Sequence, residues 1–142
     1  MNPPLTLSAE FRKIVEEQMN RTIQGIEATF FVIMEKQKIS PQEVKEEMDS
    51  LQENFNVLFQ KWNLEILYTL LLKKTSGFGG LKKILEVNSR TLSDKLKLLN
   101  SRGYIERNVQ TGPPLRVTYA LSTKGKNTVL LSLPLLYYST AV

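Results

Sequence analysis

The 142-residue chain is 42% hydrophobic and carries a formal net charge of +5, which suits one globular domain, or a small domain with a helical attachment. It contains no cysteine and no histidine, which excludes disulfides and thiolate metal sites and removes the commonest zinc ligands and proton carriers of enzymes. No apolar run reaches the ~20 residues that a membrane-spanning helix needs, so we expect a cytoplasmic protein that is not an enzyme and has no cofactor, metal or membrane partner.

The charge is divided unevenly along the chain. Residues 1–62 carry 7 basic and 10 acidic side chains, a balance of −3, whereas residues 63–142 carry 12 basic and 4 acidic ones, a balance of +8. A basic half beside an acidic half favours binding of a polyanion by the C-terminal half alone. A lysine-rich surface that simply faces solvent is the alternative that charge by itself leaves open.

Two amphipathic helices are predicted in residues 1–60. Ser8 is the expected N-cap of the first helix, which runs to about residue 37. Its apolar positions recur at steps of three and four: Phe11, Val15, Met19, Ile23, Ile26, Phe30, Ile33 and Met34. Residues 40–43, Ser-Pro-Gln-Glu, form a capping box that starts the second helix. This helix continues as a heptad seam: Val44, Met48, Leu51, Phe55, Leu58 and Trp62.

Neither apolar stripe can form a core alone, so each must pack on another surface. Apolar residues also lie off the first stripe, at Ala28, Phe31 and Val32, which indicates burial on more than one side. We therefore expect residues 1–60 to be a dimerisation element. A helical hairpin docked on the rest of the same chain is the alternative.

Residues 61–142 are predicted to begin with three helices. The expected helices are 63–74, 81–86 and 89–102. A glycine-containing loop over 75–80 separates the first two, and Asn88 is the expected N-cap of the third. Gly103 follows the third helix as a typical C-terminal residue.

A β-hairpin and a last helix complete this half. Alternating residues over 104–109 and 115–121 predict two strands that are joined by a glycine-proline tip over 110–114. Ser122 is expected to cap the last helix, and the apolar run 129–138, interrupted by Pro134, to be a helix end that packs on another surface. The predicted fold class is mainly α with a small β-hairpin, a winged helix-turn-helix with an N-terminal helical hairpin.

The third helix of this half has two chemically different sides. Leu92, Leu96 and Leu99 share one side at helical spacing, and the other side is polar and partly basic. A helix that lies in the DNA major groove needs this combination, because its leucines face the core while its polar side chains reach base edges. The predicted DNA-binding residues of the helix are Ser89, Arg90, Thr91, Asp94, Lys95 and Lys97. Those of the hairpin, expected at the phosphate backbone or minor groove, are Arg107, Gln110, Thr111 and Arg116.

Eighteen residues from Lys61 onwards match the pattern of a known family: Lys61, Trp62, Leu64, Ile66, Leu67, Phe78, Leu81, Leu92, Leu96, Leu99, Gly103, Ile105, Arg107, Pro114, Val117, Tyr119, Leu121 and Gly125. Through these residues, the segment from Lys61 resembles the HxlR-type winged-helix regulators of bacteria and archaea. The resemblance implies a dimeric DNA-binding regulator, and MarR-type regulators share the same winged core. Two features depart from the family: the long helical N-terminal half and the lack of a cysteine, which excludes thiol-based sensing.

The sequence thus predicts a homodimeric transcription factor, a repressor, that binds a pseudo-palindromic site on double-stranded DNA, and it indicates no effector ligand. A winged helix that docks on protein within a larger assembly is the alternative. Such modules usually carry apolar residues on the exposed side of the third helix, and only Leu98 approaches that description. Non-specific coating of DNA would require basic charge over the whole surface rather than in one half.

Overall fold

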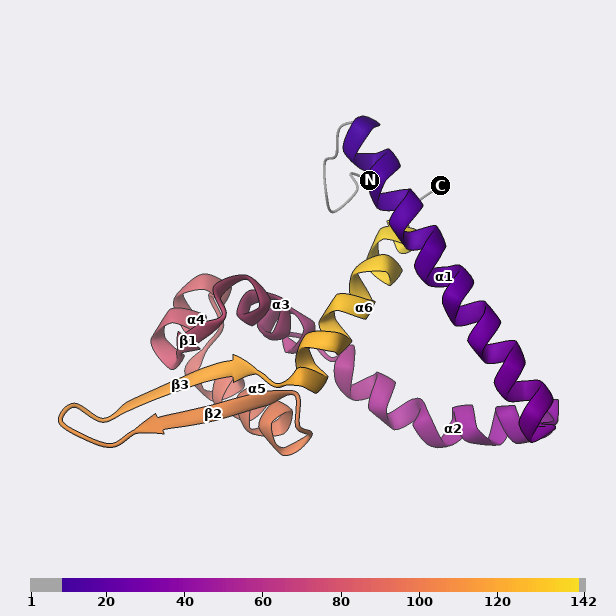
Figure 1. Cartoon of the computed structure of the whole chain (residues 1–142). Helices are drawn as coiled ribbons and strands as arrows, with labels where there is room; N and C mark the ends of the chain where they lie inside the picture. The colour runs from indigo at the N-terminus through magenta and orange to yellow at the C-terminus, as the bar shows by residue number, and fades with distance from the viewer. Residues whose placement is uncertain (1–8, 141–142) are drawn as a thin grey trace. The chain divides into compact units, whose positions relative to one another are not determined.

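The computed structural model describes residues 9–140, which belong to two compact units. Residues 54–133 form one unit, and residues 9–53 and 134–140 belong to the other. In chain order the elements are α1 (Ala9–Gln37), α2 (Pro41–Leu58), α3 (Asn63–Lys73), β1 (Thr75–Gly77), α4 (Phe78–Leu85), α5 (Ser89–Ser101), β2 (Ile105–Gln110), β3 (Arg116–Leu121) and α6 (Thr123–Thr140) (Figure 1). The predicted fold class, a winged helix-turn-helix after two N-terminal helices, is confirmed.

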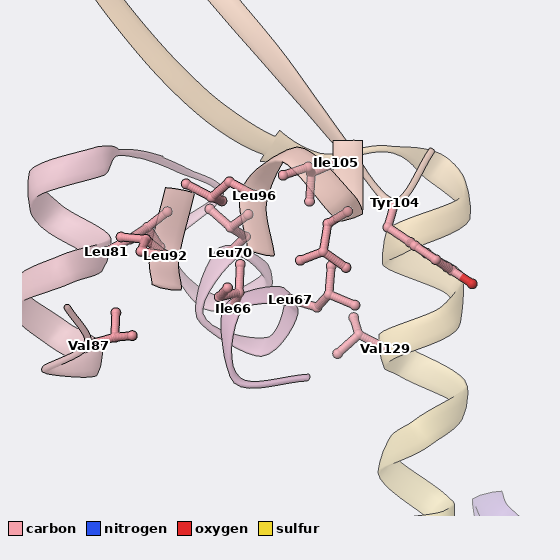
Figure 2. Packing of buried hydrophobic residues seen from close by; sticks show 11 residues of the cluster. Ile66, Leu67, Leu70, Leu81, Val87, Leu92, Leu96, Tyr104, Ile105 and Val129 are labelled. Carbon is pink, nitrogen blue, oxygen red and sulfur yellow. The ribbon is translucent and has the colours of Figure 1, made fainter. Parts of the chain in front are cut away.

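Residues 54–133 enclose one hydrophobic core. Figure 2 shows side chains of α3 packed between leucines of α4 and α5 on one side and Val129 of α6 on the other. The core members are Ile66, Leu67, Leu70, Leu81, Val87, Leu92, Leu96, Leu99, Tyr104, Ile105 and Val129. Burial of one such aliphatic side chain stabilises a fold by about 1.5–3 kcal/mol. The predicted leucine side of α5 therefore does face the core.

Three antiparallel strands form the sheet, in the order β1-β3-β2. β2 pairs with β3 from Ile105↔Leu121 at the core end to Gln110↔Arg116 at the far end. The strand β1 pairs with β3 through Thr75↔Ala120 and Gly77↔Thr118. Beyond β1, β2 and β3 continue as a two-stranded hairpin (Figure 1).

The segment 75–86 differs from our prediction of a loop over 75–80 and a helix over 81–86. Thr75–Gly77 is strand β1, and α4 already begins at Phe78. A three-residue strand is too short to show alternation, and its partner lies more than forty residues away, so local sequence did not reveal it. Gly80 permits this tight connection, because a Cβ at that position would lie 2.7 Å from the Ser76 hydroxyl.

The joint from α2 to α3 contains one buried and two more exposed polar contacts. The side-chain amide of Asn63, which is fully buried, donates to the Val57 carbonyl at 2.6 Å. Before it, Trp62 has a left-handed backbone, with a φ of 82°. Its amide donates to the Glu65 carboxylate at 3.0 Å, and the Lys61 ammonium lies 4.6 Å from its ring centre. These contacts stabilise the backbone conformation of residues 57–65, which all belong to one unit.

The turn between β3 and α6 is fastened to the end of α5. The predicted cap is confirmed, since the Ser122 hydroxyl accepts from the Gly125 amide at 3.0 Å. The Ser122 amide donates to the Tyr104 carbonyl at 3.1 Å, and the Lys124 ammonium donates to the Arg102 carbonyl at 2.8 Å. A Cβ at Gly125 would overlap the Tyr104 carbonyl oxygen. Only glycine therefore allows α6 to approach this closely.

The predicted helix end over residues 129–138 is confirmed, because α6 continues through Pro134 to Thr140. A proline inside a helix removes one backbone hydrogen bond, but its fixed φ is helical, so flanking residues can carry the helix past it. The end of α6 belongs with α1 in the second unit. There the Tyr137 hydroxyl donates to the Glu16 carboxylate at 2.9 Å, and this bond raises the pKa of Tyr137.

The N-terminal helices leave their apolar side chains uncovered. The predicted capping box of α2 is confirmed, because the Glu43 amide donates to the Ser40 hydroxyl at 3.2 Å and the Ser40 amide donates to the Glu43 carboxylate at 3.3 Å. The predicted N-cap Ser8 and the side chain of Phe11 lie outside the described part. Among the described side chains of residues 9–53, none is fully buried.

Candidate nucleic-acid interface

The helix α5 is held by caps at both ends. At its start, the Asn88 side chain accepts from the Thr91 amide at 2.8 Å, as predicted. At its end, Gly103 has a left-handed φ of 81°, the Gly103 amide donates to the Asn100 carbonyl and the Tyr104 amide to the Leu99 carbonyl. This pair of bonds is a Schellman motif, which ends a helix at a defined residue. The helix therefore has a fixed length and rotation against the core.

The side of α5 opposite its leucines is exposed and polar. Leu92 and Leu99 are 0% exposed and Leu96 is 2% exposed. Of the predicted site residues on α5, four are exposed: Ser89, Arg90, Asp94 and Lys97. Thr91 and Lys95 are half-buried at the flank of this surface. The outward surface thus offers two cations, a carboxylate and a hydroxyl within two turns of helix.

Lys95 differs from the other basic residues of α5 because it has a partner. Its ammonium donates to the Gln60 side-chain carbonyl at 3.0 Å, at the joint between α2 and α3. Gln60 lies before the helices that were expected to form the site, and its role was not predicted. A contact between residues so far apart in sequence leaves no local signal.

A shallow, open depression lies between α4 and the start of α5. Its lining residues are Gly79, Lys82, Lys83, Glu86, Val87, Asn88 and Ser89. The turn at Glu86, which has a left-handed φ of 54°, brings α4 back beside the N-terminus of α5. Two further exposed cations, Lys82 and Lys83, thereby lie beside the predicted residue Ser89. The adjacent lysines are visible in the sequence, but their position beside the site depends on this turn.

The hairpin does not bring its predicted site residues together on one face. Arg107 lies opposite Tyr119, whereas Gln110 lies opposite Arg116. Because alternate residues of a strand point to opposite faces, Arg107 lies on one face and the Gln110–Arg116 pair on the other. Thr111 follows directly at the tip, and all four of these side chains are exposed.

The face that carries Arg107 is otherwise apolar. Val109 pairs with Val117 on it. Towards the tip, Val109 is 44% exposed and Leu115 is 67% exposed. The hairpin is therefore amphipathic along its whole length, but only its core end is covered.

Positive charge dominates this part of the chain. Residues 78–116 contain 8 basic and 3 acidic side chains, and no acidic residue follows Glu106 in the sequence.

Among residues 9–140 no group of three or more His, Cys, Asp or Glu side chains could hold a metal ion. None of the described helices is long and apolar enough to cross a membrane. The exposed side of α5, the neighbouring lysines of α4 and the hairpin together provide hydrogen-bond donors and cations for a polyanion.

Comparisons with known proteins agree with this arrangement. A family model described as HxlR-like helix-turn-helix matches residues 57–135. Two Bacillus subtilis (strain 168) proteins, each described as an uncharacterized HTH-type transcriptional regulator, are similar in sequence. YdzF is 38% identical over 68 residues, which are 47% of this chain and 62% of YdzF. YvaP is 32% identical over 72 residues, which are 50% of this chain and 66% of YvaP. The chain thus spans less than two thirds of either relative.

Solved structures of regulators share the fold. Diamide-treated YodB from Bacillus subtilis has a TM-score of 0.57 at 22% identity, covering 71% of this chain and 92% of YodB. A putative MarR-family regulator from Enterococcus faecalis V583 has a TM-score of 0.56 at 25% identity, covering 65% of this chain and 83% of that one. The family model covers more than half of the chain. The chain therefore belongs to the HxlR-like helix-turn-helix family of transcriptional regulators, as its sequence predicts, and this family is not one of enzymes.

Proposed function

We propose that this protein is a homodimeric transcriptional repressor that binds a pseudo-palindromic site on double-stranded DNA. The observation that carries the proposal is the two-sided character of α5. Its leucines are buried, so its rotation is fixed, and its outward side presents Arg90, Asp94 and Lys97 to solvent. A capped helix with such a side fits the major groove, whose base edges carry a distinct donor and acceptor pattern for each base pair.

Four polar side chains of α5 have specific chemical roles in this proposal. Arg90, in the first turn, can donate two parallel hydrogen bonds to O6 and N7 of a guanine. Asp94, one turn later, can accept from N4 of a cytosine. Ser89, Thr91 and the neighbouring Lys82 and Lys83 would bind phosphates, which position a helix without reading sequence.

The hairpin supplies the second set of DNA contacts. Arg107 and Arg116 lie on opposite faces of it, so they would reach different phosphates, one on each side of the groove that the hairpin follows. Gln110 and Thr111 near the tip add neutral donors. These contacts would strengthen binding to any duplex more than they discriminate between sequences.

Pairing of two chains is supported by uncovered apolar surface on α1 and α2. The partly exposed stripe residues are Ile23, Ile26, Phe30, Ile33, Met48, Leu51 and Phe55, with exposed fractions between 41% and 58%. Together they offer roughly 700 Å² of surface, close to the ~800 Å² per partner of a standard stable interface. A second copy would give the two recognition helices the symmetry of a palindromic site. Repression by occupying a promoter needs only the DNA-binding surface of the winged unit and the pairing surface on α1 and α2.

A salt titration tests the DNA-binding proposal. With about 6–8 phosphate contacts over two heads, log K should fall against log salt concentration with a slope of roughly −5 to −7. The measurement uses the full chain, a duplex from its own promoter and a random competitor duplex. A slope near −1, with no preference for the promoter duplex, would contradict DNA binding and favour a protein-docking module.

A further inference from the structure

Four consecutive large apolar residues of α1 are exposed. Phe30 is 49% exposed, Phe31 63%, Val32 50% and Ile33 44%. Successive residues of an α-helix are rotated by about 100°. These four side chains therefore point to all sides of α1, and not along one stripe.

The apolar character extends over two helical turns. Residues 28–34, Ala-Thr-Phe-Phe-Val-Ile-Met, contain no charged side chain, and we name them the apolar girdle. Thr29 does not interrupt the apolar girdle, because its hydroxyl donates to the Gly25 carbonyl at 2.8 Å and so has its hydrogen-bond partner within the helix. A helix that is apolar on every side is normally buried on every side.

Within its own unit, the girdle is not covered on every side. The end of α6 meets the other half of α1, where Tyr137 contacts Glu16 and where Val15 and Met19 are half-buried. The helix α2 follows after a short turn and can cover at most one side. Within this unit the remaining sides are open to helices of another molecule.

Charge and area identify a second copy of this chain as that molecule. Residues 9–53 carry 6 basic and 10 acidic side chains, so a nucleic acid would be repelled. Phe31 and Val32 add about 200–250 Å² to the roughly 700 Å² of the stripe residues, and the total of about 900–950 Å² exceeds the ~800 Å² per partner that a stable dimer buries. A two-fold axis would place each girdle against the other, with identical apolar surfaces in contact.

We infer that the α1 helices of two copies cross at the apolar girdle and form the centre of the dimer, with the α2 helices of both copies around them. This inference rests on the proposed homodimer and specifies its arrangement. It differs from a pairing through one stripe, in which Phe30 is buried and Phe31, about 100° away, stays in solvent. The two adjacent phenylalanines therefore distinguish the arrangements.

Glutamate substitutions in the full chain provide the test. Phe30→Glu and Phe31→Glu should each convert the dimer to a monomer in light scattering at micromolar concentration. Gln24→Glu, two turns before Phe31 on the same side of α1, is the control and should remain dimeric. The monomeric variants should keep the melting transition of the winged unit and lose about 10²–10⁴-fold in affinity for the palindromic site.

A second test uses substitutions that introduce no charge, and it applies even if the glutamate variants fail to fold. Because the chain has no cysteine, Phe31→Cys and Gln24→Cys introduce single thiols. The inference expects alkylation of the Phe31→Cys thiol to be at least tenfold slower than that of the Gln24→Cys thiol. A dimeric Phe31→Glu variant, or equal alkylation rates, overturns the inference but leaves the homodimer. A monomeric full chain overturns both, whereas a dimer that binds no DNA overturns only the DNA-binding proposal.

Discussion

The ammonium of Lys95 on α5 donates a hydrogen bond to the side-chain carbonyl of Gln60, which precedes it by 35 residues. The bond is 3.0 Å long and ties the flank of the candidate recognition helix to the joint between α2 and α3. Lys95 must give up this partner before it can bind a phosphate. Lys97, on the exposed side of the same helix, has no such bond to break among the interactions described.

The first prediction compares these two lysines. Lys97→Ala should weaken binding to all duplexes, because a phosphate contact is lost. The slope of log K against log salt concentration should become less negative by about one for each DNA-binding head. Lys95→Ala should change the slope by less than half as much. Titrations of both variants over a range of salt concentrations measure this difference, and equal slopes would show that Lys95 leaves Gln60 in the complex.

The second prediction separates base reading from phosphate binding. Arg90→Ala should cost about 1–3 kcal/mol on the preferred site and much less on random duplex, because a base-edge contact is lost. Arg116→Ala should weaken both kinds of complex similarly. Competition binding with the two duplexes decides between these outcomes. If Arg90→Ala weakened random duplex as strongly as the preferred site, the outward side of α5 would not be the reading surface.

The third prediction concerns the core behind α5. Leu96 is 2% exposed, so Leu96→Ala should lower the free energy of unfolding by about 2–5 kcal/mol through the cavity it leaves. Leu72, which is 68% exposed, is the matched control, and Leu72→Ala should change stability by less than about 0.5 kcal/mol. Urea denaturation measures both values. Equal losses would contradict the orientation of α5 described above.

The fourth prediction concerns the approach of α6 to Tyr104. Gly125→Ala forces a methyl group against the Tyr104 backbone, whose carbonyl carbon would lie 2.9 Å from it. Neither backbone segment can move freely, so we expect a loss of about 1–3 kcal/mol, as for overpacked sites. At Gly79, also helical, an added Cβ meets nothing within 4 Å, and Gly79→Ala should be neutral or stabilising by up to about 1 kcal/mol. A Gly125→Ala protein as stable as the wild type in urea would disprove the close approach.

Much of the fold could be predicted because its signals are local. The caps at Ser40, Asn88 and Ser122 each depend on residues three positions apart, and all three are confirmed. The leucine side of α5 follows from helical spacing alone. The strand β1 was missed because its only signal is a partner strand far along the chain. The helix end over residues 129–138, in contrast, is confirmed, since α6 runs through Pro134 to Thr140.

The candidate site could be predicted only in part, for a related reason. Spacing along α5 predicts which side chains share its outward side, and Arg90, Asp94 and Lys97 are indeed exposed. It cannot predict contacts between elements, such as Lys95 with Gln60, or Lys82 beside Ser89. The separation of Arg107 from Arg116 depends on the register across the hairpin, which the length and geometry of its tip determine. Whether these residues bind DNA stays a prediction.

The left-handed Trp62 at the joint between α2 and α3 has a practical consequence. It is the one tryptophan of the sequence, it is half-buried against the core, and a lysine ammonium lies over its ring. Indole emission changes in colour and intensity when water or charge around the ring changes. The protein therefore carries a built-in fluorophore at the connection from α2 to α3, within residues 54–133. Any rearrangement of that connection on addition of DNA can be followed in real time without a label.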